Sequence, residues 1–437
     1  MRAGAAAFFC AAALFAQDES AIYTRPSDVL NSQLPAWMRF SGDYRARFED
    51  QEHMRWRPAN SDLYVLSRLR LGLQLKPLSW LTFYGQAQDS RIFFPKRIAP
   101  LPPVQDALDL RMAYVELGDP KKFPLQLRAG RQEITYSEER LIGVSNWSNL
   151  GRTFNAVKLL VQAPHAGGMK LEAFAGSVVA AREAMWNRSI AGDNFHGAYA
   201  VFDKLLPQGT VEPYIFWRLS PNVTTETAPR GKLDHRSHGL RVTRKFGPGW
   251  YASSDTVFQI GNRGTDSVKA WAAYWRVRRL YPAASWKPTL TGDLNMATGD
   301  KNPRDGIFQT FDVLYPTPHD KYGLADQVGW KNIRHVSGAV ELTPRKGITL
   351  QSKLHSWWLA SAMDGLYSAQ GNLLVRDPLG RSGKHAGEEL DFQFLWTPAK
   401  TLVVGGGVGR IFAGEFLRKA SPSSPYTFYF LSLTRTL

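Results

Sequence analysis

Pairs of arginines separated by a single residue are the groups in this sequence best suited to chemistry. Arg45 and Arg47 form one such pair, and Arg68 and Arg70 form another. A guanidinium group is planar, stays charged and can pair with a carboxylate through two parallel hydrogen bonds. Because residues two apart in an extended strand point to the same side, each pair would present two cations on one face. The spacing therefore indicates reversible binding of anions rather than bond-making chemistry.

Further charged side chains extend these faces along the chain. Arg128 shares a strand face with Gln126. Lys353 shares a face with Gln351 and His355. A solvated ion pair is worth only about 0.2–1 kcal/mol, so a solute carboxylate could pass from one cation to the next, and conduction needs such weak binding. The acidic residues that would hold the cations in place are Asp43, Glu49, Glu133, Glu172 and Asp293.

The segment from Trp37 to Glu49 indicates which kind of element positions these groups. Apolar and polar side chains alternate through it, as in a strand with one face in lipid and one in water. Turning this strand over would cost on the order of 10 kcal/mol, at roughly 2–4 kcal/mol per arginine near the bilayer midplane. The charged face must therefore look into water. The apolar face comprises Phe40, Gly42, Tyr44, Ala46 and Phe48, and the polar face comprises Arg39, Ser41, Asp43, Arg45, Arg47 and Glu49.

Eight short turns, each containing a proline, divide the chain into strand-length runs. The runs approach the ~9–11 residues that a tilted strand needs to cross a bilayer, about twice the length of a soluble strand. Eight hairpins and one further run at each end give eighteen strands. The pattern predicts an all-β fold, namely a single transmembrane antiparallel β-barrel of about 18 strands over residues 37–437, with short periplasmic turns and longer extracellular loops. The turn prolines are Pro77, Pro120, Pro164, Pro207, Pro248, Pro282, Pro344 and Pro398. Tryptophans expected in an interfacial girdle near the turns are Trp37, Trp80, Trp250, Trp286 and Trp396.

The N-terminus has the composition of a secretory signal. One arginine precedes a small apolar run that ends near Ala16, and Cys10, the single cysteine, lies inside it. We expect a signal peptide over residues 1–16, with cleavage after Ala13 as the alternative, and a short periplasmic segment over 17–36. The net charge of +16 would suit nucleic acid, but the arginines recur within alternating strands instead of clustering. We therefore expect no nucleic-acid partner.

Three parts of the sequence leave their structure open. The runs 108–117 and 402–412 alternate too poorly to assign their faces. The long segment from Thr298 to Trp330 is either a lid or plug of the pore, or a surface loop rich in turn residues. His235 and His238 are expected as a surface loop pair rather than metal ligands.

Two segments carry a family resemblance. The first begins with Gly130-Arg131-Gln132-Glu133 and continues through 139–155, and the second runs from Ala297-Thr298-Gly299-Asp300 through Gly323. Together they resemble the alginate export family of Gram-negative outer-membrane proteins. The resemblance implies an eighteen-stranded monomeric barrel whose arginine-rich constriction passes an anionic uronate polymer outward. It also implies that Arg131 and Glu133 form a basic and acidic constriction pair, and that Arg152 is a second basic position.

The strand faces and the resemblance together predict a channel in the outer membrane of a Gram-negative bacterium. Its substrate would be an anionic polysaccharide of the alginate-like polyuronate type, or, as the alternative, small anions in a porin with no polysaccharide role. Lipopolysaccharide would surround the barrel, and periplasmic export partners could serve it. The candidate path residues are Arg131, Glu133, Arg152, Arg45, Arg47, Arg68, Arg70, Arg128 and Lys353.

The sequence gives no reason to expect an enzyme, a cofactor or a metal. The histidines are dispersed, and the glycine run at 405–409 lacks the Lys-Ser/Thr of a phosphate loop. A membrane-embedded hydrolase would need serine, histidine and acid on one outer face of the barrel. His355-Ser356 is the nearest candidate, and no acid is evident beside it.

Overall fold

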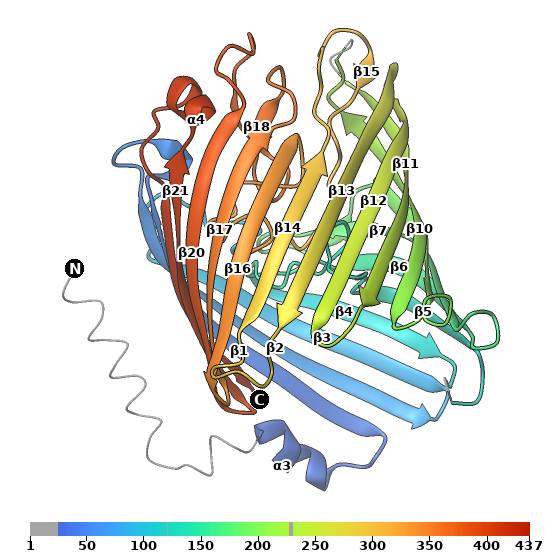
Figure 1. Ribbon diagram of the computed structural model, residues 1–437. Coiled ribbons are helices and arrows are strands. Elements are labelled where there is room, and N and C mark those ends of the chain that lie inside the picture. Colours follow the sequence, from blue (N-terminus) through green and yellow to red (C-terminus); the bar gives the residue numbers. More distant parts are fainter. Residues whose placement is uncertain (1–24, 120, 227–229) are drawn as a thin grey trace.

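The computed structural model describes residues 25–119, 121–226 and 230–437. Within these ranges, eighteen antiparallel strands form one closed barrel, because β1 pairs with β2 on one side and with β22 on the other. Each neighbouring pair in the wall is sequential along the chain (Figure 1). The strands of the wall are β1 (Met38–Glu52), β2 (Asp62–Leu78), β3 (Leu81–Phe93), β4 (Asp106–Leu117), β5 (Leu125–Gln132), β6 (Phe154–Ala163), β7 (Met169–Ala180), β9 (Asn194–Phe202), β10 (Gly209–Val223), β11 (Gly231–Lys245), β12 (Trp250–Arg263), β13 (Asp266–Leu280), β14 (Thr289–Ala297), β16 (Ile333–Arg345), β17 (Ile348–Leu359), β20 (His385–Ala399), β21 (Leu402–Ala413) and β22 (Thr427–Thr436).

The eight predicted turns are confirmed, since each joins two consecutive strands of the wall, although Pro120 of the second turn lies outside the described residues. Figure 1 shows these turns at one end of the barrel and the longer connections at the other. The C-terminus lies at the short-turn end beside helix α3 (Pro26–Gln33), whose Ser27 Oγ donates to the carbonyl of Leu437 at 2.5 Å. The predicted signal peptide at 1–16 lies outside the described residues, as does the first part of the 17–36 segment.

Short helices and strands lie at the long-loop end of the barrel. No helix in the described part of the chain is both long and apolar enough to cross a membrane. The short elements at the long-loop end are η1 (Met54–Trp56), β8 (Arg188–Ser189), β15 (Ile307–Phe308), β18 (Gly365–Tyr367), β19 (Leu373–Arg376) and α4 (Glu415–Ala420).

The alternation of side chains between lipid and lumen is also confirmed. In β2, Leu71 is 51% exposed while the neighbouring Arg70 is 5% exposed, because successive residues of a strand point to opposite faces. The tryptophans predicted for the girdle are all exposed on the barrel. Apolar atoms thus cover the outside of the wall, and the charged faces turn inward.

The two runs that could not be phased contain local irregularities. In β4, Gln86 pairs with Met112 and Ala87 pairs with Leu110, so Arg111 is an extra, bulged residue. A bulge shifts the alternation by one position, which is why Arg111 and Met112 are both buried. In β21, glycines replace the side chains that would mark the two faces.

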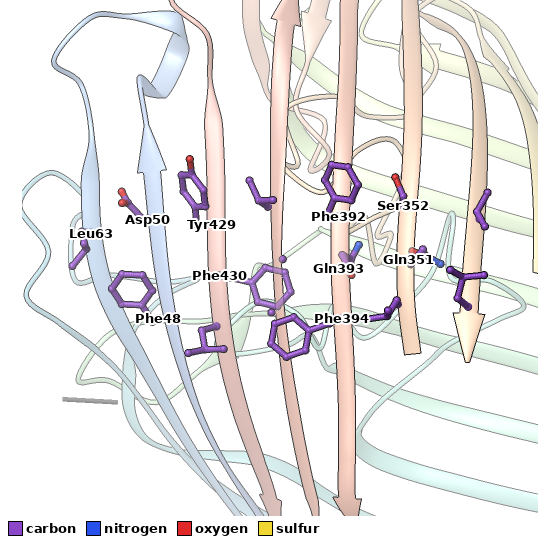
Figure 2. Close-up of a pocket in the computed structure, with 17 residues that line it drawn as sticks. Phe48, Asp50, Leu63, Gln351, Ser352, Phe392, Gln393, Phe394, Tyr429 and Phe430 are labelled. Carbon is purple, nitrogen blue, oxygen red and sulfur yellow. The ribbon is translucent and has the colours of Figure 1, made fainter. Parts of the chain in front are cut away.

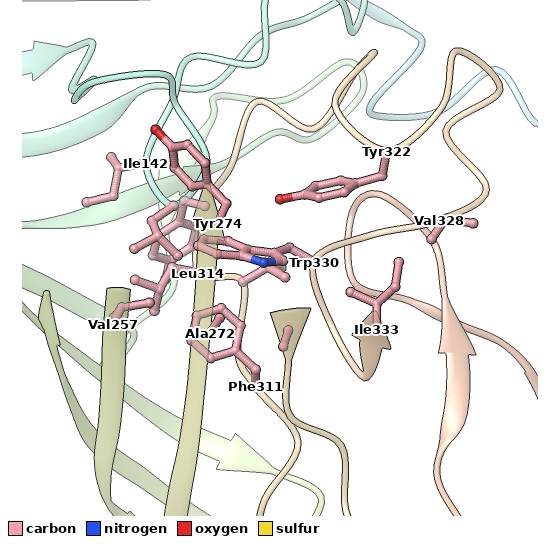
Figure 3. Packing of buried hydrophobic residues seen from close by; sticks show 14 of the residues in the cluster. Ile142, Val257, Ala272, Tyr274, Phe311, Leu314, Tyr322, Val328, Trp330 and Ile333 are labelled. Carbon is pink, nitrogen blue, oxygen red and sulfur yellow. The ribbon is translucent and has the colours of Figure 1, made fainter. Parts of the chain in front are cut away.

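Two loops fold into the barrel and fill part of its interior. They are residues 133–153, between β5 and β6, and residues 298–332, between β14 and β16, and we call them together the plug. Figure 3 shows Trp330 and Phe311 of the second loop packed near Ala272 of β13. These side chains are at most 1% exposed. The segment 298–330 is therefore an infolded plug, one of the two alternatives left open by the sequence.

Because Leu71 lies on the lipid face of β2, replacing it with arginine should destabilise the barrel by about 2–4 kcal/mol. The free energy of unfolding in lipid vesicles, measured by urea titration, would show this loss. Gln74→Arg on the lumen face of the same strand is the control and should change it little. An equal loss in both variants would contradict the assignment of the two faces.

Candidate pore and constriction

The two loops of the plug bind each other through their backbones. Ile142 and Tyr315 form a parallel bridge, in which the Tyr315 amide donates to the Leu141 carbonyl and the Gly143 amide donates to the Tyr315 carbonyl, both at 2.8 Å. The Thr317 amide donates to the carbonyl of Glu139 at 2.9 Å. These backbone hydrogen bonds make the two loops one unit across the lumen.

The arginines predicted on the inner face of β1 hold the first loop. Arg45 donates to the carbonyls of Asn146 at 2.7 Å and Ser148 at 3.0 Å. Arg47 donates to the carbonyl of Trp147 at 2.5 Å, and its guanidinium lies over the Trp147 ring at 3.8 Å. Both side chains are buried, and in this structure their terminal nitrogens donate to the plug rather than to an open path.

The arginines of β2 converge on the same stretch of loop. Arg68 donates to the Asn146 carbonyl at 3.1 Å and pairs with Asp43 at 3.2 Å. Arg70 donates to the Asn146 side chain at 2.8 Å and to the Leu150 carbonyl at 3.0 Å. The four arginines lie inside the barrel, as the alternation predicts, and their contacts make them anchors of residues 146–150.

Arg131 and Glu133 do not pair with each other. Arg131 donates to the Leu110 carbonyl at 2.9 Å and the Asn187 carbonyl at 2.6 Å. Glu133 instead forms an ion pair with Arg111, the bulged residue of β4. Arg111 was not predicted as a lumen residue, because the bulge breaks the alternation from which the face of a residue is assigned. Arg131 and Glu133 thus make separate contacts, and the constriction role that the resemblance implies for them stays a prediction.

Arg152 joins the two loops of the plug to each other. Its guanidinium donates to the carbonyls of Gly143 at 2.9 Å and Pro316 at 2.8 Å, one on each loop. The two remaining predicted cations lie on the wall, where each has an acidic neighbour. Arg128 pairs with Glu116, and Lys353 pairs with Asp320 of the second loop at 2.5 Å.

Toward the short-turn end, the lumen contains a basic region that the sequence did not single out. Two cavities of about 430 and 140 Å³ share Arg276 and Arg278 of β13 as lining residues. Arg278 and Lys245 have no acidic side chain within ion-pair distance among the described residues. The Arg276-Val277-Arg278 spacing is the same signal that marked β1 and β2. We call this region the basic vestibule, and its cations are Arg241, Arg244, Lys245, Arg276, Arg278, Lys321 and Lys353.

Glu138 of the first loop extends into the basic vestibule and binds the plug to the wall on its periplasmic side. Its carboxylate lies 2.9 Å from Arg276 and 3.4 Å from Arg241. Burial opposes its ionisation, but Arg140, Arg276 and Arg241 outweigh burial and lower the pKa of Glu138 to about 2. Glu138 is therefore a permanent anion at any physiological pH.

The segment with His235 and His238, predicted as a surface loop, is part of β11, and of the two predicted surface histidines only His238 is exposed. His235 is not in a surface loop but in β11, where it is 1% exposed and its Nε2 lies 3.3 Å from Asp312 of the plug. Arg218 pairs with the same carboxylate at 2.7 Å. Burial opposes the charge of Asp312, but Arg218 and His235 hold the pKa of Asp312 well below its usual range. The error arose because β10 and β11 extend beyond the length that a bilayer alone requires.

His355 and Ser356 cannot act together as a hydrolase. His355 is buried on the lumen side of β17, and the next residue of a strand points to the opposite face. No group of three or more His, Cys, Asp or Glu side chains in the described ranges is placed to hold a metal ion.

A larger cavity, of about 1160 Å³, lies on the outer wall rather than in the pore (Figure 2). Phe392, Phe394 and Tyr429 line it, and all three are exposed on the lipid-facing side of β20 and β22. Gly406 provides the hollow, since a Cβ there would lie 2.4 Å from the Phe394 ring.

The wall and its contents define the class of protein. A closed eighteen-stranded barrel over the described residues, apolar outside and polar inside, with short turns at one end, is the architecture of a channel in the Gram-negative outer membrane. The chain belongs to the alginate export family, whose sequence profile matches residues 36–430. The short-turn end is accordingly periplasmic and the long-loop end extracellular.

Solved structures with the same fold are outer-membrane porins. OpdQ of Pseudomonas aeruginosa gives a TM-score of 0.61 at 11% identity, with 92% of this chain and 97% of that chain covered. OpdK of the same organism, solved with vanillate, gives 0.60 at 11% identity, with 92% and 98% covered. OccAB4 of Acinetobacter baumannii gives 0.58 at 10% identity, with 92% and 98% covered. At such identities the likeness shows the fold alone. No curated protein sequence matches the chain.

Replacing Arg45 and Arg70 with alanine should loosen the plug, because residues 146–150 lose donors on both flanking strands. We expect a larger and noisier single-channel current in planar bilayers. Arg410→Ala, which changes an exposed arginine of β21, is the matched control and should leave the current unaltered. A double variant with the wild-type current would contradict the anchoring assignment.

Lys321 should make the channel's ion selectivity depend on pH. Burial and the nearby Arg140 lower the pKa of Lys321 to about 8, so the group is charged below pH 8 and neutral above it. The reversal potential in a salt gradient should therefore shift toward lower anion preference between pH 7 and 9. Lys321→Met should remove this shift, whereas Lys346→Met in an exposed turn should retain it. A wild-type reversal potential that is constant over this range would refute the prediction.

Proposed function

We propose that this outer-membrane channel passes small carboxylated solutes of the sugar-acid class. The observation that carries the proposal is the basic vestibule, whose seven cations line two cavities that share residues on the periplasmic side of the plug. The larger cavity, about 430 Å³, falls within the ~300–1,000 Å³ range of small-molecule sites. OpdK, which shares the fold, was solved with vanillate, and a carboxylate of that size would fit the same description here.

The vestibule contains both fixed and available cations. Arg276 pairs with Asp293 at 2.6 Å and with Glu138 at 2.9 Å, so its charge is partly compensated. Arg278 and Lys245 lack such partners among the described residues and are the cations that a solute carboxylate would meet. Wet pairs of this kind contribute about 0.2–1 kcal/mol each, weak enough for the solute to leave again.

A second candidate function is export of an alginate-like polyuronate, which membership of the alginate export family favours. A polymer needs a continuous path, and the two joined loops of the plug lie across the lumen. Both loops would have to move, since Arg152 and the Tyr315 backbone join them. A periplasmic export partner acting on the plug of a monomeric barrel would be consistent with this route.

Planar-bilayer recordings of the purified mature protein in a salt gradient would test the proposal. We expect an anion-selective current that millimolar glucuronate reduces and that polyuronate leaves unchanged. Lys245→Gln with Arg278→Gln should lower the anion selectivity, whereas Arg410→Gln should preserve it.

The other outcomes discriminate between the two candidates. Block by polyuronate without an effect of glucuronate would favour the polymer route. A current that is cation-selective or unselective would exclude both.

A further inference from the structure

A line of buried polar side chains crosses four neighbouring strands of the wall and begins at the plug. Arg140 of the first loop donates to Asn295 Oδ1 on β14 at 3.0 Å. Asn295 Nδ2 and His335 Nδ1 on β16 are 2.9 Å apart, and His335 Nε2 and His355 Nδ1 on β17 are also 2.9 Å apart. His355 Nε2 lies 3.1 Å from Asp391 Oδ2 on β20. All five side chains are at most 3% exposed.

The far end of this line holds the second loop of the plug. Asp391 Oδ2 accepts a hydrogen bond from the Leu324 amide at 3.1 Å. Glu389, beside Asp391 on the same strand face, accepts one from the Ala325 amide at 2.7 Å. Gly323 permits this close approach, because a Cβ there would lie 2.2 Å from the Glu389 carboxylate. The line thus connects both loops of the plug through the wall.

One arrangement of protons satisfies the three hydrogen bonds that run from Arg140 to His355. Arg140 can only donate, so Asn295 accepts with its oxygen and donates with its nitrogen. His335 must then accept at Nδ1 and donate from Nε2. His355 in turn accepts at Nδ1 and carries its proton on Nε2, which lies within ion-pair distance of the Asp391 carboxylate without forming a hydrogen bond to it. Both imidazoles are therefore neutral, and the hydrogen-bond donors point in one direction from a cation to an anion.

An additional proton has no acceptor within this arrangement. On either imidazole it would fall on an Nδ1 that already receives a hydrogen bond, and two N–H groups would then face each other. Protonation therefore replaces an attraction with a repulsion inside a buried site.

Charged groups of both signs surround the two imidazoles, so some oppose a positive charge on them and others favour it. Arg140 on the first loop and Lys353 on β17 disfavour a further positive charge on His335. The acidic groups lie near His355 and favour a positive charge there. They are Asp391 and Glu389 on β20 and Asp320 on the second loop. Tyr322 of the second loop packs against His335 with its ring edge, at 5.7 Å between centroids. Trp357 stacks on His355 at 6.2 Å.

We propose that Arg140, Asn295, His335, His355 and Asp391 form a latch that holds the plug against the wall while both imidazoles are neutral, and that acid releases it. A released, solvated imidazole titrates near pH 6.5. Below that pH, each imidazole that binds a proton only after release shifts the equilibrium toward the open plug by up to tenfold per pH unit, and the pair by up to a hundredfold. Glu138, with its pKa of about 2, does not titrate in this window.

Two measurements on the full-length mature protein test the latch. The first is hydrogen–deuterium exchange at the Leu324 and Ala325 amides, corrected for the intrinsic pH dependence of exchange. We expect protection to fall at least tenfold between pH 7 and pH 5. The His335→Gln, His355→Gln double variant, whose amides can donate and accept but cannot be protonated, should give the same protection at both pH values. His238→Gln, at an exposed position of β11, should behave like the wild type.

The second measurement is the open probability in bilayers with salt alone, which should rise at least tenfold over the same pH range in the wild type and stay constant in the double variant. Loss of protection without any current would support the latch and count against the proposed channel function. Unchanged wild-type protection, or an equal loss in the double variant, would overturn the latch. Should the double variant fail to fold, Asp391→Asn, which removes the anion but keeps an acceptor, should already lower protection at pH 7.

Discussion

The structure depends on the requirement that charged side chains in the membrane-crossing part of a strand lie on the inside of the barrel and be satisfied there. Hydrocarbon excludes these groups from the outer face, and eighteen strands enclose more space than side chains alone can fill. Residues 146–150 meet part of this requirement, because their carbonyls and the Asn146 side chain accept from Arg45, Arg47, Arg68 and Arg70. The plug is therefore folded against the wall by the same charges that orient the wall in the membrane.

Carbonyl acceptors satisfy hydrogen bonds without cancelling charge. The four arginines of β1 and β2 are only partly offset by Asp43 and Glu49, so a positive potential persists behind the plug. If residues 146–150 moved out of the lumen, these guanidinium groups would form the row of accessible cations that the strand faces predict. The small-anion and polymer routes thus differ in the state of the plug and share one barrel wall.

The sequence predicts well what depends on local alternation and poorly what depends on distant partners. The turns, the strand count and the inward arginines follow from a period of two residues and from turn chemistry. The bulge at Arg111, the separation of Arg131 from Glu133 and the burial of His235 do not, because each depends on a contact with another strand or with the plug. A face can be read from spacing, whereas the partner of a side chain is fixed only when the loops fold inward. The basic vestibule is the exception, since Arg276 and Arg278 repeat the spacing of β1 and could have been found from it.

The anchors of the plug respond to pH in different ways, and this separates their contributions. The arginines of β1 and β2 hold residues 146–150 as cationic donors, and added acid takes no proton from a guanidinium; Glu138, with a pKa of about 2, stays ionised in mild acid as well. Lys321 loses its charge near pH 8, but it lines a cavity and does not join the loops to the wall. The line through His335 and His355 connects both loops to the wall, and imidazole is the side chain whose ordinary titration falls between pH 5 and 8. Among these anchors of the described chain, acid can therefore weaken that line while leaving the arginine contacts in place, so that the plug loosens at its β14–β20 side first.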